Sequence, residues 1–210
     1  AFKTDYNQFR GFSLLRLVRH GGLSSGDVFE KWVDRQLEGK TFSDLDKNLH
    51  IIATDVTNGK PVIFNKEITP DMKVSKAVRY SMSIPLVFSF KTFGKRIMVD
   101  GSILSEDALH RDWDEQGTPI LCFRLRSENE YDEIKISGMF PIVNYIHLLI
   151  RAFMTTISRE YINENFWHNT IVINTGECSG IDFKMSQQQK NALFDIGYQT
   201  AKEIIPLKMK

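Results

Sequence analysis

The amino-acid sequence predicts an α/β protein, with helices on both faces of a sheet. Short β-rich runs alternate along the chain with amphipathic helical segments, which is typical of this class. The 210 residues are 42% hydrophobic and include 15 Phe, enough for a substantial core. A typical domain has about 150 residues, and the chain contains no repeat or linker, so we expect residues 1–210 to form a single domain.

Apolar residues at helical spacing predict the helices. The best defined covers residues 28–38, where Asp27 as N-cap and Glu30 have the spacing of a capping box and Gly39 ends the helix. Ser186 and Gln189 have the same spacing before a helix that runs to about residue 204. The other helical segments are expected within residues 1–20, from Val74 to Met82, and over residues 141–164.

The β-rich runs predict the strands. Residues 49–56 and 61–65 flank Asn58-Gly59, a pair that favours a hairpin because a type I′ turn needs two residues tolerant of positive φ. Residues 86–90 and 96–99 are predicted to form two strands around a turn at Phe93-Gly94. Further strands are expected over residues 120–125 and 171–174.

Charge and hydropathy argue against two classes of protein. Lys and Arg number 27 and Asp and Glu 26, so the basic excess that a nucleic-acid surface needs is missing. No run reaches the 18 or more apolar residues of a membrane span. No apolar leader follows Ala1, so we expect a cytoplasmic protein, and the lack of an initial Met leads us to expect a longer gene product.

Cysteine and histidine spacing predicts neither a metal nor a cofactor. Cys122 and Cys178 are compatible with a disulfide, but two free thiols in a reducing compartment are the preferred interpretation. There is no C-x-x-C or H-E-x-x-H pattern, and the five His residues are not paired at helical spacing.

One candidate nucleophile is Ser24, because Gly22-Leu-Ser-Ser-Gly26 fits the G-x-S-x-G pattern of a nucleophile elbow. An elbow follows a strand, and the preceding Arg16-Leu-Val-Arg-His20 is a poor strand. A Gly/Ser loop before a helix is therefore the preferred interpretation, and a hydrolase using Ser24 stays as an alternative.

Asp100 is the candidate for acid–base chemistry. It follows the strand predicted over residues 96–99, and α/β folds place functional groups at the carboxyl ends of strands. Gly101 permits a sharp turn that leaves the carboxylate uncovered. Asp-Gly is also an ordinary turn, so the pattern by itself leaves both interpretations open.

Segments from about residue 20 to the C-terminus resemble the patatin-like phospholipase family, in the family's order. They are Gly22-Leu-Ser-Ser-Gly-Asp27, Thr41-Phe-Ser-Asp-Leu45, Ile51-Ile-Ala-Thr-Asp-Val-Thr-Asn-Gly59, Ala77-Val-Arg-Tyr-Ser-Met-Ser-Ile-Pro85, Met98-Val-Asp-Gly-Ser102 and Asp182-Phe-Lys-Met-Ser186. The resemblance implies a three-layer α/β fold and a lipid acyl hydrolase with a Ser-Asp dyad, whose Asp corresponds to Asp100.

Two motifs of the family are absent from residues 1–20: the glycine-rich oxyanion loop and the nucleophile elbow. The resemblance therefore implies an N-terminally incomplete patatin-like domain, whose first strands and Ser lie upstream and which is inactive alone. A non-catalytic binding or scaffolding module is the alternative. Two departures from the family pattern are Ser102, where Gly or Ala is usual, and the acidic pair Glu106 and Asp107.

The implied partner is a lipid or acyl-ester substrate, with transient contact to a membrane surface and no nucleic acid. Two segments are candidates for that contact, and each has a structural alternative, as core or as a solvated helix face. The candidate apolar rim is Met82, Ile84, Leu86, Val87 and Phe88, and the candidate basic segment carries Arg10, Arg16, Arg19 and His20. Asp55, inside the predicted hairpin, is expected to be structural.

Overall fold

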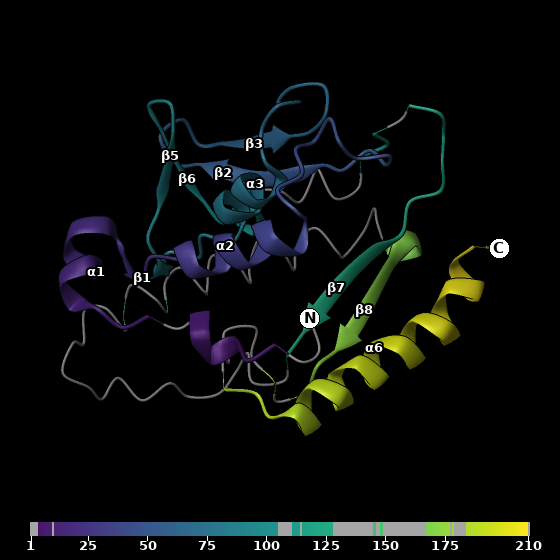
Figure 1. The fold of residues 1–210 in the computed structure, drawn as a ribbon. Coiled ribbons are helices and arrows are strands. Elements are labelled where there is room, and N and C mark those ends of the chain that lie inside the picture. The colour runs from purple at the N-terminus through teal and green to yellow at the C-terminus, as the bar shows by residue number, and fades with distance from the viewer. Residues whose placement is uncertain are drawn as a thin grey trace.

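The computed structural model shows a mixed α/β architecture, which confirms the predicted class (Figure 1). It describes residues 4–9, 11–104, 111–113, 115–127, 145, 148, 167–176, 178 and 184–209. Among these residues the strands form one four-stranded and two two-stranded hydrogen-bonded sheets. Helix α3 (Val74–Ser81) packs on the four-stranded sheet and α2 (Asp27–Gln36) packs on α3.

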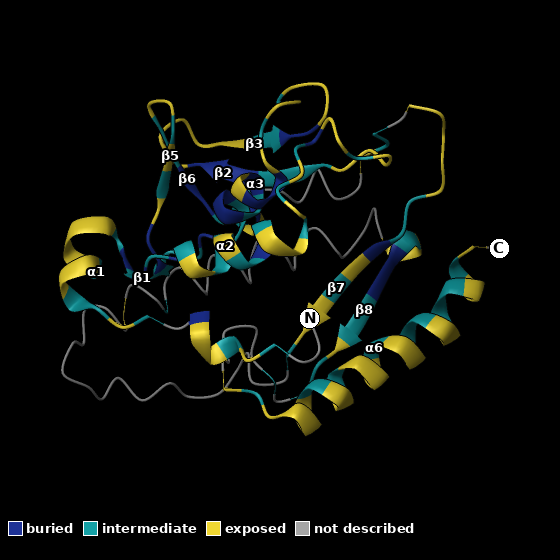
Figure 2. Cartoon of the chain, in the orientation of Figure 1, coloured by how far each residue is buried: buried dark blue, intermediate teal, exposed yellow. Residues whose placement is uncertain are grey.

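The four-stranded sheet has the order β3-β2-β6-β5 and is antiparallel throughout. Its strands are β2 (Ile51–Asp55), β3 (Lys60–Phe64), β5 (Lys91–Phe93) and β6 (Arg96–Val99). The core lies between this sheet and α3, where buried positions gather (Figure 2). Its fully buried members are Phe42, Ala53, Phe64, Val74, Ala77, Tyr80 and Met98.

The predicted hairpin is present, but its turn is not the predicted one. Asp55 pairs with Lys60, so four residues, 56–59, connect β2 and β3. Gly59 has positive φ (64°) and Asn58 does not, which excludes the two-residue type I′ turn. The Asp55 carboxylate determines this loop, because it accepts hydrogen bonds from the Asn58 side-chain amide (2.7 Å) and the Thr57 backbone N–H (2.9 Å).

Asp55 is therefore structural, as expected. Burial alone would raise the pKa of this carboxyl, but the hydrogen bonds from Asn58 and Thr57 leave that pKa below its ordinary value.

The strand predicted over residues 86–90 is shorter, and its partner differs from the expected one. Strand β4 (Leu86–Phe88) pairs in parallel with β1 (Gly22–Ser24), and β5 is the hairpin partner of β6. The chain changes sheets at Ser89, whose backbone N–H donates to the Ser24 carbonyl (2.8 Å). The Phe93-Gly94 turn is confirmed, since Phe93 pairs with Arg96.

The two predicted capping boxes have different outcomes. At α6 (Gln187–Lys208), Ser186 and Gln189 cap the helix as predicted, and the helix extends past the expected residue 204. At α2 the N-cap is Gly26 rather than Asp27. Gly26 adopts the left-handed region (φ 69°), and the Ser25 hydroxyl accepts the N–H of Asp27 (3.2 Å), so Asp27 is already the first helical residue.

The remaining described elements lie at the two ends of the molecule. Near the N-terminus are the 3-10 helix Tyr6–Phe9 and helix α1 (Leu14–His20). Strands β7 (Cys122–Arg126) and β8 (Thr170–Asn174) form a parallel pair beside α6, with the 3-10 helix Trp167–Asn169 preceding β8 (Figure 1).

Several sequence predictions concern this second end of the molecule. Cys122 and Cys178 are both free. The helix predicted over residues 141–164 falls almost wholly outside the described residues. Within the described ranges, no helix has the length and apolarity needed to cross a bilayer.

Candidate functional site

Asp100 lies where β6 ends, as the sequence predicts. Its backbone N–H donates to the carbonyl of Ser83 (3.0 Å), which ties the end of β6 to the segment that follows α3. Its carboxylate caps the short 3-10 helix Gly101–Ile103 by accepting the backbone N–H of Ser102 (2.8 Å). The Ser102 hydroxyl donates to the same carboxylate oxygen.

Gly101 allows the 3-10 helix Gly101–Ile103 to contact the four-stranded sheet at β2. A Cβ atom at Gly101 would lie 2.1 Å from the backbone oxygen of Ile52 in β2, so only glycine fits. The turn is therefore fixed from two sides, by Ser83 and by β2. A carboxylate on such a turn has a defined position, which proton-transfer chemistry requires.

Burial raises the pKa of Asp100 above its ordinary value, and the hydrogen bonds from Ser102 offset this only in part. A raised pKa makes the carboxylate a stronger base than an exposed Asp. A fixed position and a raised pKa are features that make Asp100 a candidate general base.

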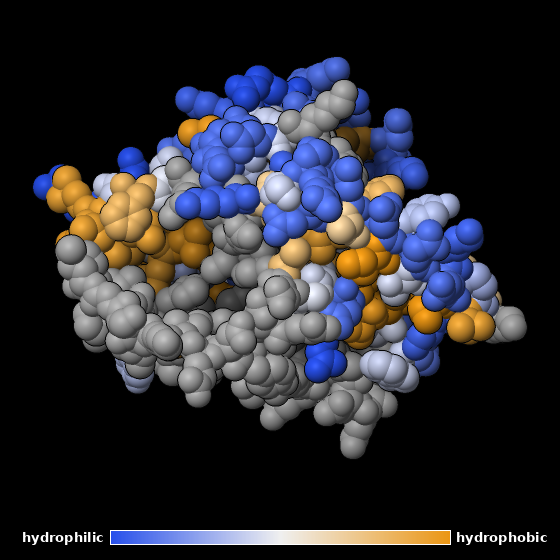
Figure 3. All heavy atoms as spheres, turned by 90° about the horizontal axis from the view of Figure 1, so that it is seen from below, coloured by the Kyte–Doolittle hydropathy of each residue, from blue (hydrophilic) through white to orange (hydrophobic). Residues whose placement is uncertain are grey.

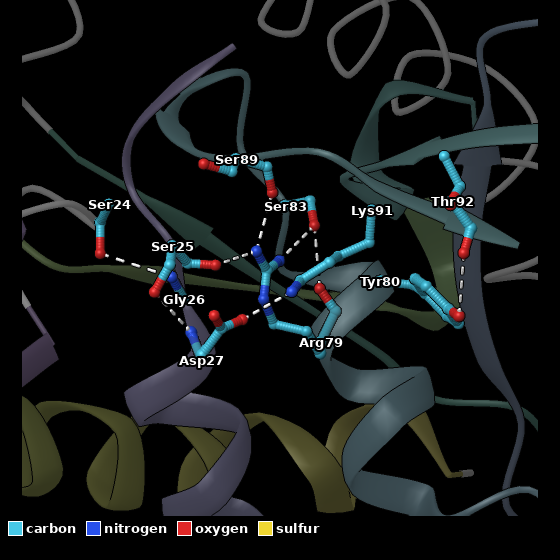
Figure 4. Close-up of polar contacts among 10 residues, drawn as sticks. All are labelled: Ser24, Ser25, Gly26, Asp27, Arg79, Tyr80, Ser83, Ser89, Lys91 and Thr92. Atoms are coloured by element: carbon cyan, nitrogen blue, oxygen red, sulfur yellow. Dashed lines mark hydrogen bonds and ion pairs between the residues drawn. The ribbon is translucent and has the colours of Figure 1, made fainter. Parts of the chain in front are cut away.

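Arg79 of α3 organises the segment that contacts Asp100 (Figure 4). Its side chain is 1% exposed, and one end of the guanidinium donates to the Ser83 hydroxyl (2.6 Å). The other end donates to the backbone oxygens of Ser89 (2.7 Å) and Ser25. This side chain thus joins the segment that follows α3 to Ser25, which lies 54 residues earlier in the sequence.

The Arg79 guanidinium also explains the glycine before α2. A Cβ atom at Gly26 would lie 2.6 Å from Nε of Arg79, so the guanidinium occupies the space that any other residue would need. Burial lowers the pKa of Arg79, and the nearby charges of Asp27 and Glu30 counteract that shift. Asp27 itself forms an ion pair with Lys91 (2.6 Å) beside this group (Figure 4).

Sequence reasoning did not identify Arg79 as a site residue. An isolated Arg on an amphipathic helix is usually solvated. The one signal was its spacing: Ser75, also buried, lies four residues earlier and therefore on the same helix face.

Among the residues that the structure describes, Ser24 has no partner for catalysis. Its side chain is buried, and its hydroxyl donates to the backbone oxygen of Phe9 (3.1 Å) and accepts the N–H of Gly26 (3.4 Å). Neither partner is a general base, and the contacts of Asp100 do not include Ser24. The preferred interpretation expected a Gly/Ser loop, but Gly22–Ser24 form strand β1, and only Ser25 and the N-cap Gly26 lie between this strand and α2.

The predicted apolar rim is only partly exposed. Phe88 is buried, and the other four members, Met82, Ile84, Leu86 and Val87, are part-buried. This segment therefore packs mainly against its neighbours. Glu106 and Asp107, the acidic pair expected near the site, lie outside the described residues.

Leu86, at the start of β4, has φ of 68°, in the left-handed region where a side chain is strained. We expect Leu86→Ile to destabilise the fold by about 1 kcal/mol, although volume and hydrophobicity are conserved, because a β-branched residue is worse still at positive φ. Urea unfolding followed by circular dichroism measures the change. Leu125→Ile in β7 is the matched control and should be nearly neutral; equal effects of the two changes would contradict strain at Leu86.

Comparison with known proteins assigns the fold and motifs to a family. The family model described as patatin-like phospholipase matches residues 2–110, about half of the chain. The chain belongs to the patatin-like phospholipase family. The matched region includes Asp100, Gly101 and the whole Arg79 cluster (Arg79, Ser25, Gly26, Ser83 and Ser89), which places these residues within the patatin-like part of the chain.

Three relatives illustrate the breadth of the patatin-like similarity. The chain is 29% identical over 205 residues to the uncharacterized protein R571 of Acanthamoeba polyphaga mimivirus, covering 92% of this chain and 68% of that protein. It is 31% identical over 191 residues to the uncharacterized protein YqhO of Bacillus subtilis, covering 84% and 65%. A shorter match, 28% over 93 residues, is to the probable lipid hydrolase 463L of Invertebrate iridescent virus 6, covering 40% and 32%.

Among solved structures, VipD from Legionella pneumophila is similar with a TM-score of 0.50 and 19% sequence identity. The similarity covers 77% of this chain and 31% of VipD, and it supports the fold. The chain thus spans about two thirds of the length of the mimivirus and Bacillus relatives and about a third of VipD.

Proposed function

We propose that the intact protein is a lipid acyl hydrolase in which Asp100 is the general base of a Ser-Asp dyad, with the Ser upstream of residue 1. Membership of the patatin-like family supports the substrate class, as does the relative described as a probable lipid hydrolase. The observation that carries the proposal is the geometry of Asp100: a carboxylate with a raised pKa at a strand end, fixed by Ser83, Ser102 and the Gly101 contact.

The proposed reaction has two proton transfers through the same carboxylate. The Ser oxygen attacks the ester carbonyl while its proton passes to Asp100, and backbone amides stabilise the oxyanion. The alcohol then leaves with that proton, and an acyl-Ser remains. Water attacks the acyl-Ser, Asp100 accepts a proton from the water, and this proton returns to the Ser oxygen as the fatty acid leaves. No cofactor takes part in the proposed reaction.

A second candidate function is a non-catalytic patatin-like binding or scaffolding module. Ser102 favours it, because its backbone N–H and its hydroxyl both donate to Oδ1 of Asp100, and these hydrogen bonds lower the basicity of the carboxylate. Turnover by the intact protein distinguishes the two candidates. If Ser102→Gly increases turnover, the Ser102 hydroxyl interferes with the reaction and the protein is a hydrolase. If neither the wild-type protein nor this variant hydrolyses any ester, the protein is a non-catalytic module.

The 210-residue chain alone is expected to show no esterase activity, because the dyad Ser and the oxyanion amides are proposed to lie outside it. Hydrolysis of a short p-nitrophenyl ester by the isolated chain measures this. Turnover that disappears in Ser24→Ala would contradict the proposal and identify Ser24 as the nucleophile. In the intact protein, Ser24→Ala should retain activity within a few fold.

Two further proposals concern where the protein acts. The lipid substrate implies transient contact with a membrane surface, and a cytoplasmic location remains the proposal made from the sequence. The apolar rim, being part-buried, is too limited for that contact. The surface best suited to it lies on helix α1.

A further inference from the structure

Helix α1 presents unusual side chains to solvent. It is a seven-residue helix, capped by the Ser13 hydroxyl and ended by Gly21 in the left-handed conformation. Three large apolar side chains on and before it are highly exposed: Phe12 (71%), Leu15 (61%) and Val18 (84%). Such side chains close together on a surface indicate an interaction site rather than a solvated face.

The exposed face of α1 has an apolar half and a basic half. Leu15 and Val18 are one helical turn apart. Arg16 follows Leu15 and Arg19 follows Val18, so the two exposed Arg residues are also one turn apart. The opposite side of the helix is part-buried, and α1 packs on β1. Figure 3 shows one group of hydrophobic atoms at the end of the molecule where α1 lies, and a second group toward the opposite end.

The charge of this region has a single sign. Residues 6–26 contain no Asp or Glu. Among the residues that the structure describes, neither Arg16 nor Arg19 has an ion-pair partner. Two cations beside exposed apolar side chains, without a compensating carboxylate, complement an anionic surface that also has an apolar interior.

Helix α1 is linked to the candidate site through the β1–β4 pair. The carbonyl of Gly21, which ends α1, accepts the N–H of Leu86 (3.2 Å), three residues after the Ser83 that contacts Asp100. Phe90, 37% exposed, packs against Gly21 and extends the apolar surface beyond β4. A surface that rests on α1 would therefore lie beside β4, the strand that follows Ser83.

We propose that Phe12, Leu15, Arg16, Val18, Arg19 and Phe90, here called the α1 face, bind the surface of an anionic lipid bilayer. The apolar side chains enter the boundary between head groups and acyl chains, and the two guanidinium groups contact lipid phosphates. The proposal rests on the proposed function for the source of the anionic surface, a substrate-bearing membrane. Binding itself requires no catalysis.

The test uses the intact protein carrying Asp100→Asn, so that no lipid is consumed. Sedimentation with vesicles of phosphatidylcholine alone, or of phosphatidylcholine with phosphatidylserine, measures binding. We expect tighter binding to the anionic vesicles, lost at high salt because ions screen the contact. Arg16→Gln with Arg19→Gln should weaken binding to anionic vesicles about 25-fold, about 5-fold for each cation near the surface.

Matched controls separate the α1 face from overall charge and hydropathy. Lys60→Gln with Lys95→Gln removes the same charge from exposed hairpin residues and should change binding less than about 2-fold, since charges far from the surface are screened. Leu15→Ser with Val18→Ser should weaken binding about 10-fold, through lost apolar burial. Val56→Ser with Ile68→Ser, at similarly exposed sites elsewhere, should not weaken it.

Three results would overturn the proposal: equal binding to both kinds of vesicle, equal losses in the α1 variants and their controls, or no vesicle binding at all. A lowered Tm of Leu15→Ser with Val18→Ser would also overturn it, because it would show that another part of the protein covers the α1 face. None of these outcomes would contradict the proposed Ser-Asp dyad, because hydrolysis of a short dissolved ester tests the role of Asp100 without a membrane.

Discussion

Replacing Asp100 by Asn is expected to reduce kcat of the intact protein by about 100-fold or more, the usual contribution of a general base. The amide cannot accept the proton of the Ser hydroxyl. The fold should survive, because the Asn oxygen can still accept the Ser102 N–H that caps the 3-10 helix, and burial disfavours the charge that the change removes. Steady-state kinetics with a short ester, alongside circular dichroism, measures both effects.

The pH profile gives a second view of the same residue. Burial raises the pKa of Asp100, so this carboxyl takes up its proton at a higher pH than an exposed Asp as the solution is acidified. The base is active only when ionised. The kcat/KM of the intact protein should therefore fall with decreasing pH through a value above the ordinary Asp range.

Asp55→Asn is the matched control for Asp100→Asn. It replaces a buried carboxylate of the same sheet that caps a loop, so it should change stability and leave kcat within a few fold. Retention of activity in Asp100→Asn with an intact fold, or equal losses of kcat in the two variants, would reject Asp100 as the base.

Gly101→Ala is expected to destabilise the protein by about 3 kcal/mol, at the upper end of the usual cost of overpacking, because the new methyl group would meet the backbone of β2. In a protein of this size such a loss lowers Tm by about 6–12 °C. The turn that carries Asp100 must also shift, so kcat should fall while the ester still binds. Thermal unfolding and kinetics measure the two effects.

Gly197→Ala is the matched control for Gly101→Ala. Gly197 lies in α6, where an added Cβ atom has no neighbour within 4 Å. Alanine at an open helical position should stabilise the protein by about 1 kcal/mol. An unchanged Tm in Gly101→Ala would show that the 3-10 helix after Asp100 moves freely away from β2.

Local patterns in the sequence predicted the elements they specify. The capping box at Ser186 and Gln189 was predicted correctly because its partners are three residues apart, and the end of β6 at Asp100 followed from a short β-rich run. The turn after Asp55 was predicted wrongly because a side-chain carboxylate overrode the preference of Asn58-Gly59. The α2 N-cap differs because Gly26 leaves room for Arg79, far away in sequence.

The parts of the candidate site that sequence missed are those that depend on contacts between distant segments. No local pattern relates Arg79 to Ser25, and none shows that residues 86–88 pair with β1 instead of β6. The backbone strain at Leu86 was not predicted for the same reason: it results from the path of the chain between two sheets rather than from neighbouring residues. Asp100 was identified because the end of a strand can be predicted from sequence. The contacts that hold it, from Ser83 and from β2 at Gly101, could not be predicted in this way.

The parallel pairing of β1 with β4 has a consequence for synthesis of the protein. Gly22 pairs with Leu86, so β1 leaves the ribosome roughly sixty residues before its partner. At about 5–20 residues per second, this interval lasts about 3–13 s. During that time the edge of β1 has no native strand partner, and a nascent chain in this state is a natural client for a chaperone.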